Sequence, residues 1–156
     1  MTVPDSQTGL AKPSPEPPLV ARLIERGGAA RLTEASFDAF VAAPGEAALF
    51  FTEDPVRFRE VLDVAVILPE LAAAASRRFR IGVLPPALAS AKAAAYGVRR
   101  WPALVFLRGG SWLGTLEGLR DWRDYLDAVN SLLEGETHPL PSRVIPVAAA
   151  GGPPCA

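Results

Sequence analysis

Residues 101–116 constrain the fold of this chain more than any other stretch. Residues 103–107 (Ala-Leu-Val-Phe-Leu) form a continuous apolar run, which is short enough for a strand that is buried on both faces. Gly109 and Gly110 follow, and two adjacent glycines supply the positive φ angles of a tight hairpin turn. Residues 112–116 then return as the antiparallel partner. The segment therefore predicts a β-hairpin with one fully buried strand.

Trp101-Pro102 directly precedes this buried strand. Proline has no N–H to donate, so it is excluded from central positions of a sheet. An X-Pro bond also adopts the cis form at a small free-energy cost. The dipeptide therefore predicts a special backbone shape at the start of the strand.

The rest of the body alternates between strand and helix patterns. Apolar runs predict strands at residues 47–52 and 78–84 and a short one at 29–32. Helical spacing and start signals predict helices over residues 19–26, 55–62, 63–77, 87–96 and 122–133, and another that begins after Thr33. Pro69 should kink the helix that contains it. Strands that alternate with helices pair in parallel, so we expect a mixed α/β sheet with helices on both faces.

The ends of the chain differ from the body in composition. Residues 1–18 and 137–156 together hold ten of the 16 prolines and show no apolar periodicity. Such segments bury too little apolar surface to offset the entropy cost of ordering them. We therefore expect a disordered Pro-rich tail at 1–18, one domain at 19–136, and a disordered Pro/Gly-rich tail at 137–156.

The order of elements around Pro102 resembles the second half of a thioredoxin domain. This resemblance implies a thioredoxin-like fold with a cis proline, Pro102, before the third buried strand. It also makes Pro69 the counterpart of the proline that kinks the family's active-site helix, which puts the two cysteine positions at about Val61 and Val64. The only cysteine is Cys155, near the end of the chain. Dithiol chemistry is therefore excluded, and we predict that the protein is not an enzyme.

Other chemistry has little support in the sequence. The net charge of −1 gives no general attraction to nucleic acid or to an anionic membrane. One cysteine and one histidine offer no metal-ligand pattern, so we expect no cofactor and no metal. His138 is interpreted as an incidental polar residue, and Trp101 and Trp112 as packing residues. No run reaches the 18 apolar residues of a membrane helix, and no secretory signal precedes the body, so we expect a cytoplasmic protein without membrane insertion.

A group of acidic residues follows the strand at 47–52. Two interpretations are open for it: a solvated face whose acids complement a helix dipole, or a rim where a partner docks. The acids are Glu53, Asp54, Glu60, Asp63 and Glu70, and Arg57 and Arg59 lie among them.

Four stretches of the body resemble the hydrogenase expression/formation family of HyaE and HupG type. They read FFTEDPVRFRE (50–60), LDVAVILPEL (62–71), RWPALVFLRGG (100–110) and LEGLRDW (116–122), and the similarity covers about residues 19–134. Members of this family have a thioredoxin-like fold without the cysteine pair. They are taken to assist maturation of the iron–sulfur small subunit of membrane-bound [NiFe] uptake hydrogenases.

The resemblance implies an accessory chaperone that binds the twin-arginine signal peptide of the small subunit precursor. Other hydrogenase accessory proteins are further candidate partners. We expect the peptide to bind at an apolar surface near Trp101 and Pro102, flanked by the five acids above, since such a signal is basic at one end and apolar behind it. The alternative is a redox-inactive, thioredoxin-fold structural subunit of a larger assembly.

Overall fold

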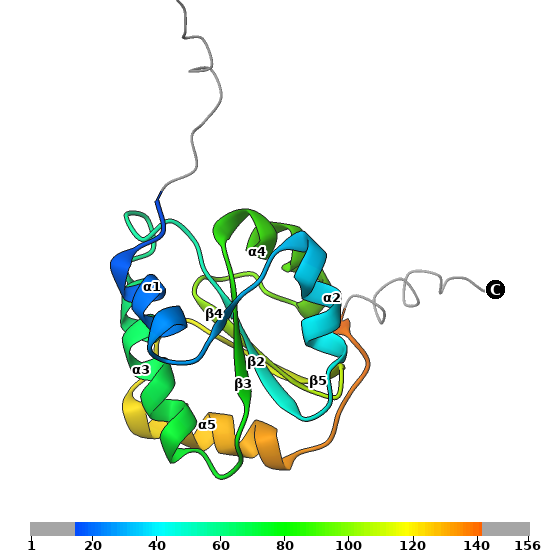
Figure 1. Ribbon diagram of the computed structural model, residues 1–156. Coiled ribbons are helices and arrows are strands. Elements are labelled where there is room, and N and C mark those ends of the chain that lie inside the picture. Colours follow the sequence, from blue (N-terminus) through cyan, green and yellow to red (C-terminus); the bar gives the residue numbers. More distant parts are fainter. Residues whose placement is uncertain (1–14, 142–156) are drawn as a thin grey trace, which may run out of the picture.

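The computed structural model describes residues 15–141, which form one α/β domain (Figure 1). The helices are α1 (Pro18–Glu25), α2 (Glu34–Ala42), α3 (Glu60–Ala74), α4 (Pro86–Lys92), the short 3-10 helix η2 (Ala94–Tyr96) and α5 (Trp122–Glu134). The strands are β1 (Ala30–Arg31), β2 (Glu46–Phe51), β3 (Arg80–Leu84), β4 (Ala103–Arg108) and β5 (Ser111–Glu117).

The five strands form one mixed sheet in the order β1-β3-β2-β4-β5. β3 pairs in parallel with both β1 and β2, whereas β4 is antiparallel to β2 and to β5. Gly109 and Gly110 form the turn between β4 and β5 with φ angles of 56° and 89°. The predicted hairpin is confirmed, and its first strand lies inside the sheet.

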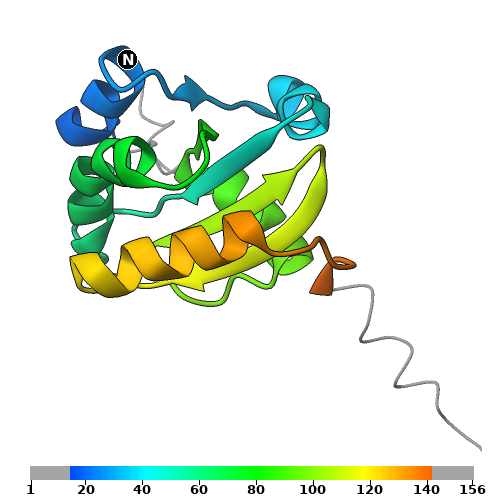
Figure 2. The same cartoon turned by 90° about the horizontal axis from the view of Figure 1, so that it is seen from below.

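Helices cover both faces of this sheet, as the alternating pattern predicted. α1, α3 and α5 pack on one face, and α2, α4 and η2 pack on the other. Side chains of β2 alternate between the two cores: Phe50 faces α3 and α5, while Leu49 and Phe51 face α2 and α4. All three are fully buried, so the continuous apolar run in β2 reflects a strand covered on both sides. Figure 2 shows α5 lying across its face of the sheet.

Some predicted helix bounds are wrong. Residues 55–57 form a turn, and one helix, α3, replaces the two helices expected over 55–77. The reason lies at Asp54, whose carboxylate accepts a hydrogen bond from the Val56 N–H (3.0 Å), an arrangement that stabilises a turn. α3 then continues through Pro69 to Ala74. The strand expected from residue 78 begins at Arg80, and the helix expected over 87–96 is divided into α4 and η2.

Contacts with the body extend past the expected bounds of 19 and 136. Residues 15–17 lie against the body, and α1 begins at Pro18. At the other end the His138 N–H donates to the Trp112 carbonyl (2.7 Å), and Leu140 packs against the α2/α4 core. Residues 1–14 and 142–156, including Cys155, lie outside the described residues, and so do most of the two predicted tails.

Candidate functional site

The carboxyl ends of β2 and β3 meet at one edge of the sheet. Thr52, directly after β2, is the residue that joins them, because its N–H and its hydroxyl both donate to the Leu84 carbonyl (3.2 and 2.7 Å). Thr52 is buried, which is tolerable because its hydroxyl has this partner. β4 begins at the same edge, since Phe51 pairs with Ala103 across the antiparallel ladder.

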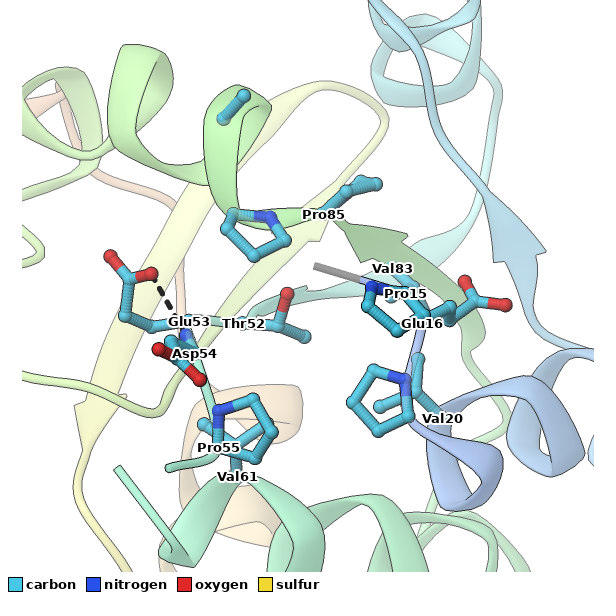
Figure 3. A pocket seen from close by; sticks show the side chains of 13 residues that line it. Pro15, Glu16, Val20, Thr52, Glu53, Asp54, Pro55, Val61, Val83 and Pro85 are labelled. Atoms are coloured by element: carbon cyan, nitrogen blue, oxygen red, sulfur yellow. Dashed lines mark hydrogen bonds between the residues drawn. The ribbon is translucent and has the colours of Figure 1, made fainter. Parts of the chain in front are cut away.

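A cavity of about 330 Å³ opens at this edge, on the side of the sheet that α1 and α3 cover (Figure 3). Three valines from three elements contribute to its lining: Val20 of α1, Val61 of α3 and Val83 of β3. Five prolines line it as well, so most of the surface offered to a ligand is apolar. These are Pro15, Pro17, Pro55, Pro85 and Pro86.

Two acids lie on one side of the cavity. Glu53 and Asp54 are both half-buried and both contribute to its lining. The Asp54 N–H donates to Glu53 Oε1 (2.8 Å), and the Val56 N–H donates to Asp54 Oδ1 (3.0 Å), so backbone groups hold both carboxylates in position. None of the four ion pairs within residues 15–141 involves either acid. Two negative charges without a basic partner in this part of the chain therefore border an apolar cavity.

The other predicted acids lie elsewhere on α3. Glu60, Asp63 and Glu70 are exposed, and none of them lines the cavity. Glu70 lies ten positions after Glu60, which is about 15 Å along the helix axis. The five acids therefore do not form one closed rim: two border the cavity and three follow the outer side of the helix.

The Trp101–Pro102 dipeptide is at the same edge, and its peptide bond is cis. Pro102 is buried and its carbonyl accepts a hydrogen bond from the Gly118 N–H (2.7 Å). Trp101 is half-buried and packs against Phe51, with 6.4 Å between ring centroids, in the core that α2 and α4 cover. Neither residue lines the cavity. Trp101 thus packs in the α2/α4 core, whereas Glu53 and Asp54 line the cavity.

Residues 15–17 line the cavity, although their composition predicts a disordered tail. Glu16 forms an ion pair with Arg31, in which Arg31 Nε donates to Oε2 (2.9 Å) and Nη2 to Oε1 (2.5 Å). This hydrogen bond to Glu16 raises the pKa of Arg31 above its usual value. Composition does not predict this contact, because a proline-rich segment that packs against the domain has the same composition as one that is disordered.

The two expected cysteine positions hold aliphatic residues. Val61 and Val64 are fully buried in the first turns of α3. Within residues 15–141 no group of three His, Cys, Asp or Glu side chains is arranged to hold a metal ion. No helix in the same range is long and apolar enough to cross a membrane. The geometry at this edge fits binding of a chain segment by its apolar and charged groups.

Comparisons with known proteins agree on family and fold. Residues 19–125 match the family model described as hydrogenase-1 expression protein HyaE. The hydrogenase expression/formation protein HoxO of Cupriavidus necator is 43% identical over 140 residues, which cover 87% of each chain. HupG of Bradyrhizobium diazoefficiens, also a hydrogenase expression/formation protein, is 37% identical over 115 residues, 71% of this chain and 78% of HupG.

Among solved structures, a mutant thioredoxin from Halobacterium salinarum superposes with a TM-score of 0.50 at 22% identity. The match covers 72% of this chain and 93% of the thioredoxin, and it confirms the thioredoxin-like fold. The family resemblance seen in the four sequence stretches is confirmed as well. The chain belongs to the HyaE family of hydrogenase expression/formation proteins.

Proposed function

We propose that this protein is a non-enzymatic chaperone of hydrogenase maturation that binds the twin-arginine signal peptide of the iron–sulfur small subunit precursor. The hydrogenase would be a membrane-bound [NiFe] uptake enzyme. One observation carries the proposal: Glu53 and Asp54 border an apolar cavity at the edge where thioredoxins hold their thiols. The names of the relatives, hydrogenase expression/formation proteins, supply the pathway.

The chemistry of the peptide matches that of the cavity. A twin-arginine signal presents two guanidinium groups followed by an apolar stretch, so its charges can face the two acids while an apolar side chain enters the cavity. Each exposed ion pair contributes about 0.2–1 kcal/mol. Burial of one aliphatic side chain contributes about 1.5–3 kcal/mol, so most of the affinity comes from the apolar part. Glu60, Asp63, Glu70, Trp101 and Pro102 remain candidates for contacts with the rest of the peptide.

Titration calorimetry with a synthetic signal peptide tests the proposal. Replacing Glu53, Asp54 and Glu60 with Gln, Asn and Gln should weaken binding without lowering the melting midpoint. A matched control replaces Glu34, Asp38 and Glu134, which are exposed acids away from the cavity, with Gln, Asn and Gln. This control makes the same change in net charge and should bind as the wild type does.

The arginine pair of the peptide provides the second arm. Replacing both arginines with glutamine should weaken binding, and combining this change with the acid substitutions should cost less than the sum of the two losses. Affinity should also fall modestly from low to physiological salt, because exposed charges are screened. If the two losses of binding free energy were strictly additive, the acids would not interact with the arginines and would be only a solvated face. Failure of the wild-type protein to bind the peptide would reject the proposal and favour a structural subunit of a larger assembly.

A further inference from the structure

Residues 15–17, here called the N-terminal strap, form the wall of the cavity opposite Glu53 and Asp54 (Figure 3). The strap consists of Pro15, Glu16 and Pro17, so the two proline rings restrict its backbone. It leads directly into α1, whose first turn is closed by a hydrogen bond from the Ala21 N–H to the Pro17 carbonyl (3.0 Å). The strap therefore walls the cavity without filling it.

The Glu16–Arg31 ion pair holds the strap in this position. Figure 3 shows the Glu16 carboxylate directed away from the cavity. There it binds two nitrogens of Arg31, the last residue of β1. Arg31 is paired with Val83 of β3, so the ion pair connects the strap to the sheet. Paired bidentate geometry restrains both side chains more than a single contact does.

On the basis of the function proposed above, we infer that the cavity receives an aliphatic side chain of the signal peptide. In the peptide, this side chain is next to a basic residue. We infer further that the strap, held by Glu16–Arg31, is one wall of that binding site. The volume of about 330 Å³ is at the small end of ligand pockets, which suits a side chain or two of an extended peptide. Glu53 and Asp54 provide the negative charge that a neighbouring arginine or lysine requires.

The position of the strap decides the sign of its effect. Because the wall is already in place around an open cavity, the peptide pays no entropy cost to order it. If the ion pair is broken, the strap must be ordered when the peptide binds, and the entropy cost of ordering it lowers the affinity. Release of the strap should therefore weaken peptide binding. If the strap instead blocked the cavity, its release would strengthen binding.

Obstruction of the cavity is the first test, with the full chain and the same signal peptide. Ala87, in the first turn of α4, is exposed and lines the cavity. Ala87→Phe should weaken peptide binding by about tenfold or more, because it takes the space of an aliphatic side chain. Ala91→Phe is the matched control: Ala91 is also exposed on α4, one turn further on, and does not line the cavity. It should bind the peptide normally.

Release of the strap is the second test. Arg31→Gln and Glu16→Gln should each weaken binding by roughly two- to fivefold, the size expected for loss of one ion pair. The double variant should be no weaker than either single one, because both changes break the same contact. Glu34→Gln is the control for charge, because it removes an exposed acid of α2 that is paired with Lys92 of α4. Tighter binding by Arg31→Gln would overturn the role of the strap as a wall.

The results separate this inference from the proposed function. Normal binding by both Ala87→Phe and Arg31→Gln, with a wild-type protein that binds the peptide, would overturn the cavity as its site and leave the function standing. No binding by the wild-type protein overturns both. Shifts of the Val20, Val61 and Val83 methyl resonances during the titration give an independent readout of the site.

Discussion

Arg80 and Arg108 each bind carbonyl oxygens at the end of a helix. Arg80 donates to the Phe40 and Ala43 carbonyls at the end of α2 (3.0 and 3.3 Å). Arg108 donates to the Gly135 carbonyl (3.0 Å) and to that of Leu133 at the end of α5. The last carbonyls of a helix lack partners within it and carry partial negative charge, so a guanidinium group is well suited to them. These two arginines thus attach a helix on each face to the sheet.

Arg108 also controls the titration of a neighbouring acid. Its Nε donates to Glu46 Oε2 (2.9 Å), and this hydrogen bond is the main reason why the pKa of Glu46 lies below its usual value of 4.5. A carboxyl group with a lowered pKa in the folded state stabilises the fold above its unfolded pKa. That contribution is lost as the pH falls through the lowered pKa.

Arg108→Met should therefore reduce stability and its pH dependence together. The aliphatic stem remains, but the contacts with Glu46, Leu133 and Gly135 are lost, and about 1.5–3 kcal/mol of unfolding free energy at neutral pH should go with them. The difference in unfolding free energy between pH about 7 and about 3 should also narrow, because Glu46 loses the contact that lowers its pKa. Urea denaturation at several pH values measures both quantities.

Arg123→Met, at an exposed position of α5, is the control and should leave both quantities nearly unchanged. If the unfolding free energy of Arg108→Met fell between pH about 7 and about 3 as much as that of the wild type, the pairing of Arg108 with Glu46 would not lower the pKa of Glu46.

Among the secondary-structure elements, α2 approaches β3 closely at Gly82. A Cβ atom at this position would lie 2.8 Å from Leu32 Cδ1 and 2.8 Å from Phe40 Cε1. Separations this short require the neighbours to move. Gly82 is therefore the position that lets the Phe40 ring of α2 rest on the middle of β3.

Gly82→Ala should lower the unfolding free energy by about 1–3 kcal/mol, the usual cost of an overpacked core. Phe40→Leu should also destabilise, in part because Phe40 lies under the Arg80 guanidinium, 4.6 Å from the ring centroid. The double variant should lose less than the sum of the two, since the smaller side chain makes room for the new methyl group. If urea denaturation showed that the two losses of unfolding free energy add, contact with Phe40 would not be the reason why a methyl group at position 82 destabilises the protein.

For the whole molecule, the end of the folded region is set by contacts past residue 136. His138 forms a bridge with Trp112 on β5, and their rings lie 6.2 Å apart in an edge-to-face arrangement. Leu140 packs against the α2/α4 core, and Pro141 Cγ lies 3.2 Å from the position of a Cβ at Gly97. Residues 138–141 thus connect the outer strand β5 to the segment after η2.

A chain that ends at Thr137 should melt lower than one that ends at Pro141. One backbone hydrogen bond and a half-buried leucine amount to about 1–2 kcal/mol, or about 4–8 °C for a domain of this size. Calorimetry of the two truncated chains measures the difference. Leu140→Ala in the full chain separates the contribution of its side chain. Equal midpoints would mean that the domain ends near residue 136, as its composition predicted.

The sequence by itself determined the architecture of this protein. The apolar run at 103–107 with Gly109 and Gly110 specifies a buried strand and a tight turn whatever surrounds them, because side-chain burial and positive φ angles are local requirements. Alternation of strands and helices then determines the layers. The position of Glu53 and Asp54 at this edge of the sheet also follows from the sequence, since they come directly after a buried strand.

Only the tertiary structure decided which groups share the cavity. Two residues at the same end of the sheet can have different surroundings. Trp101 packs in the α2/α4 core, whereas Asp54 lines the cavity, because side-chain direction depends on the full ladder and its coverings. Helical periodicity indicates that Glu70 is exposed but not what lies beside it. The strap at 15–17 has no periodic pattern at all, and its position rests on one ion pair with Arg31, fifteen residues away along the chain. Such contacts between distant segments leave no local signal, and here they position one wall of the cavity.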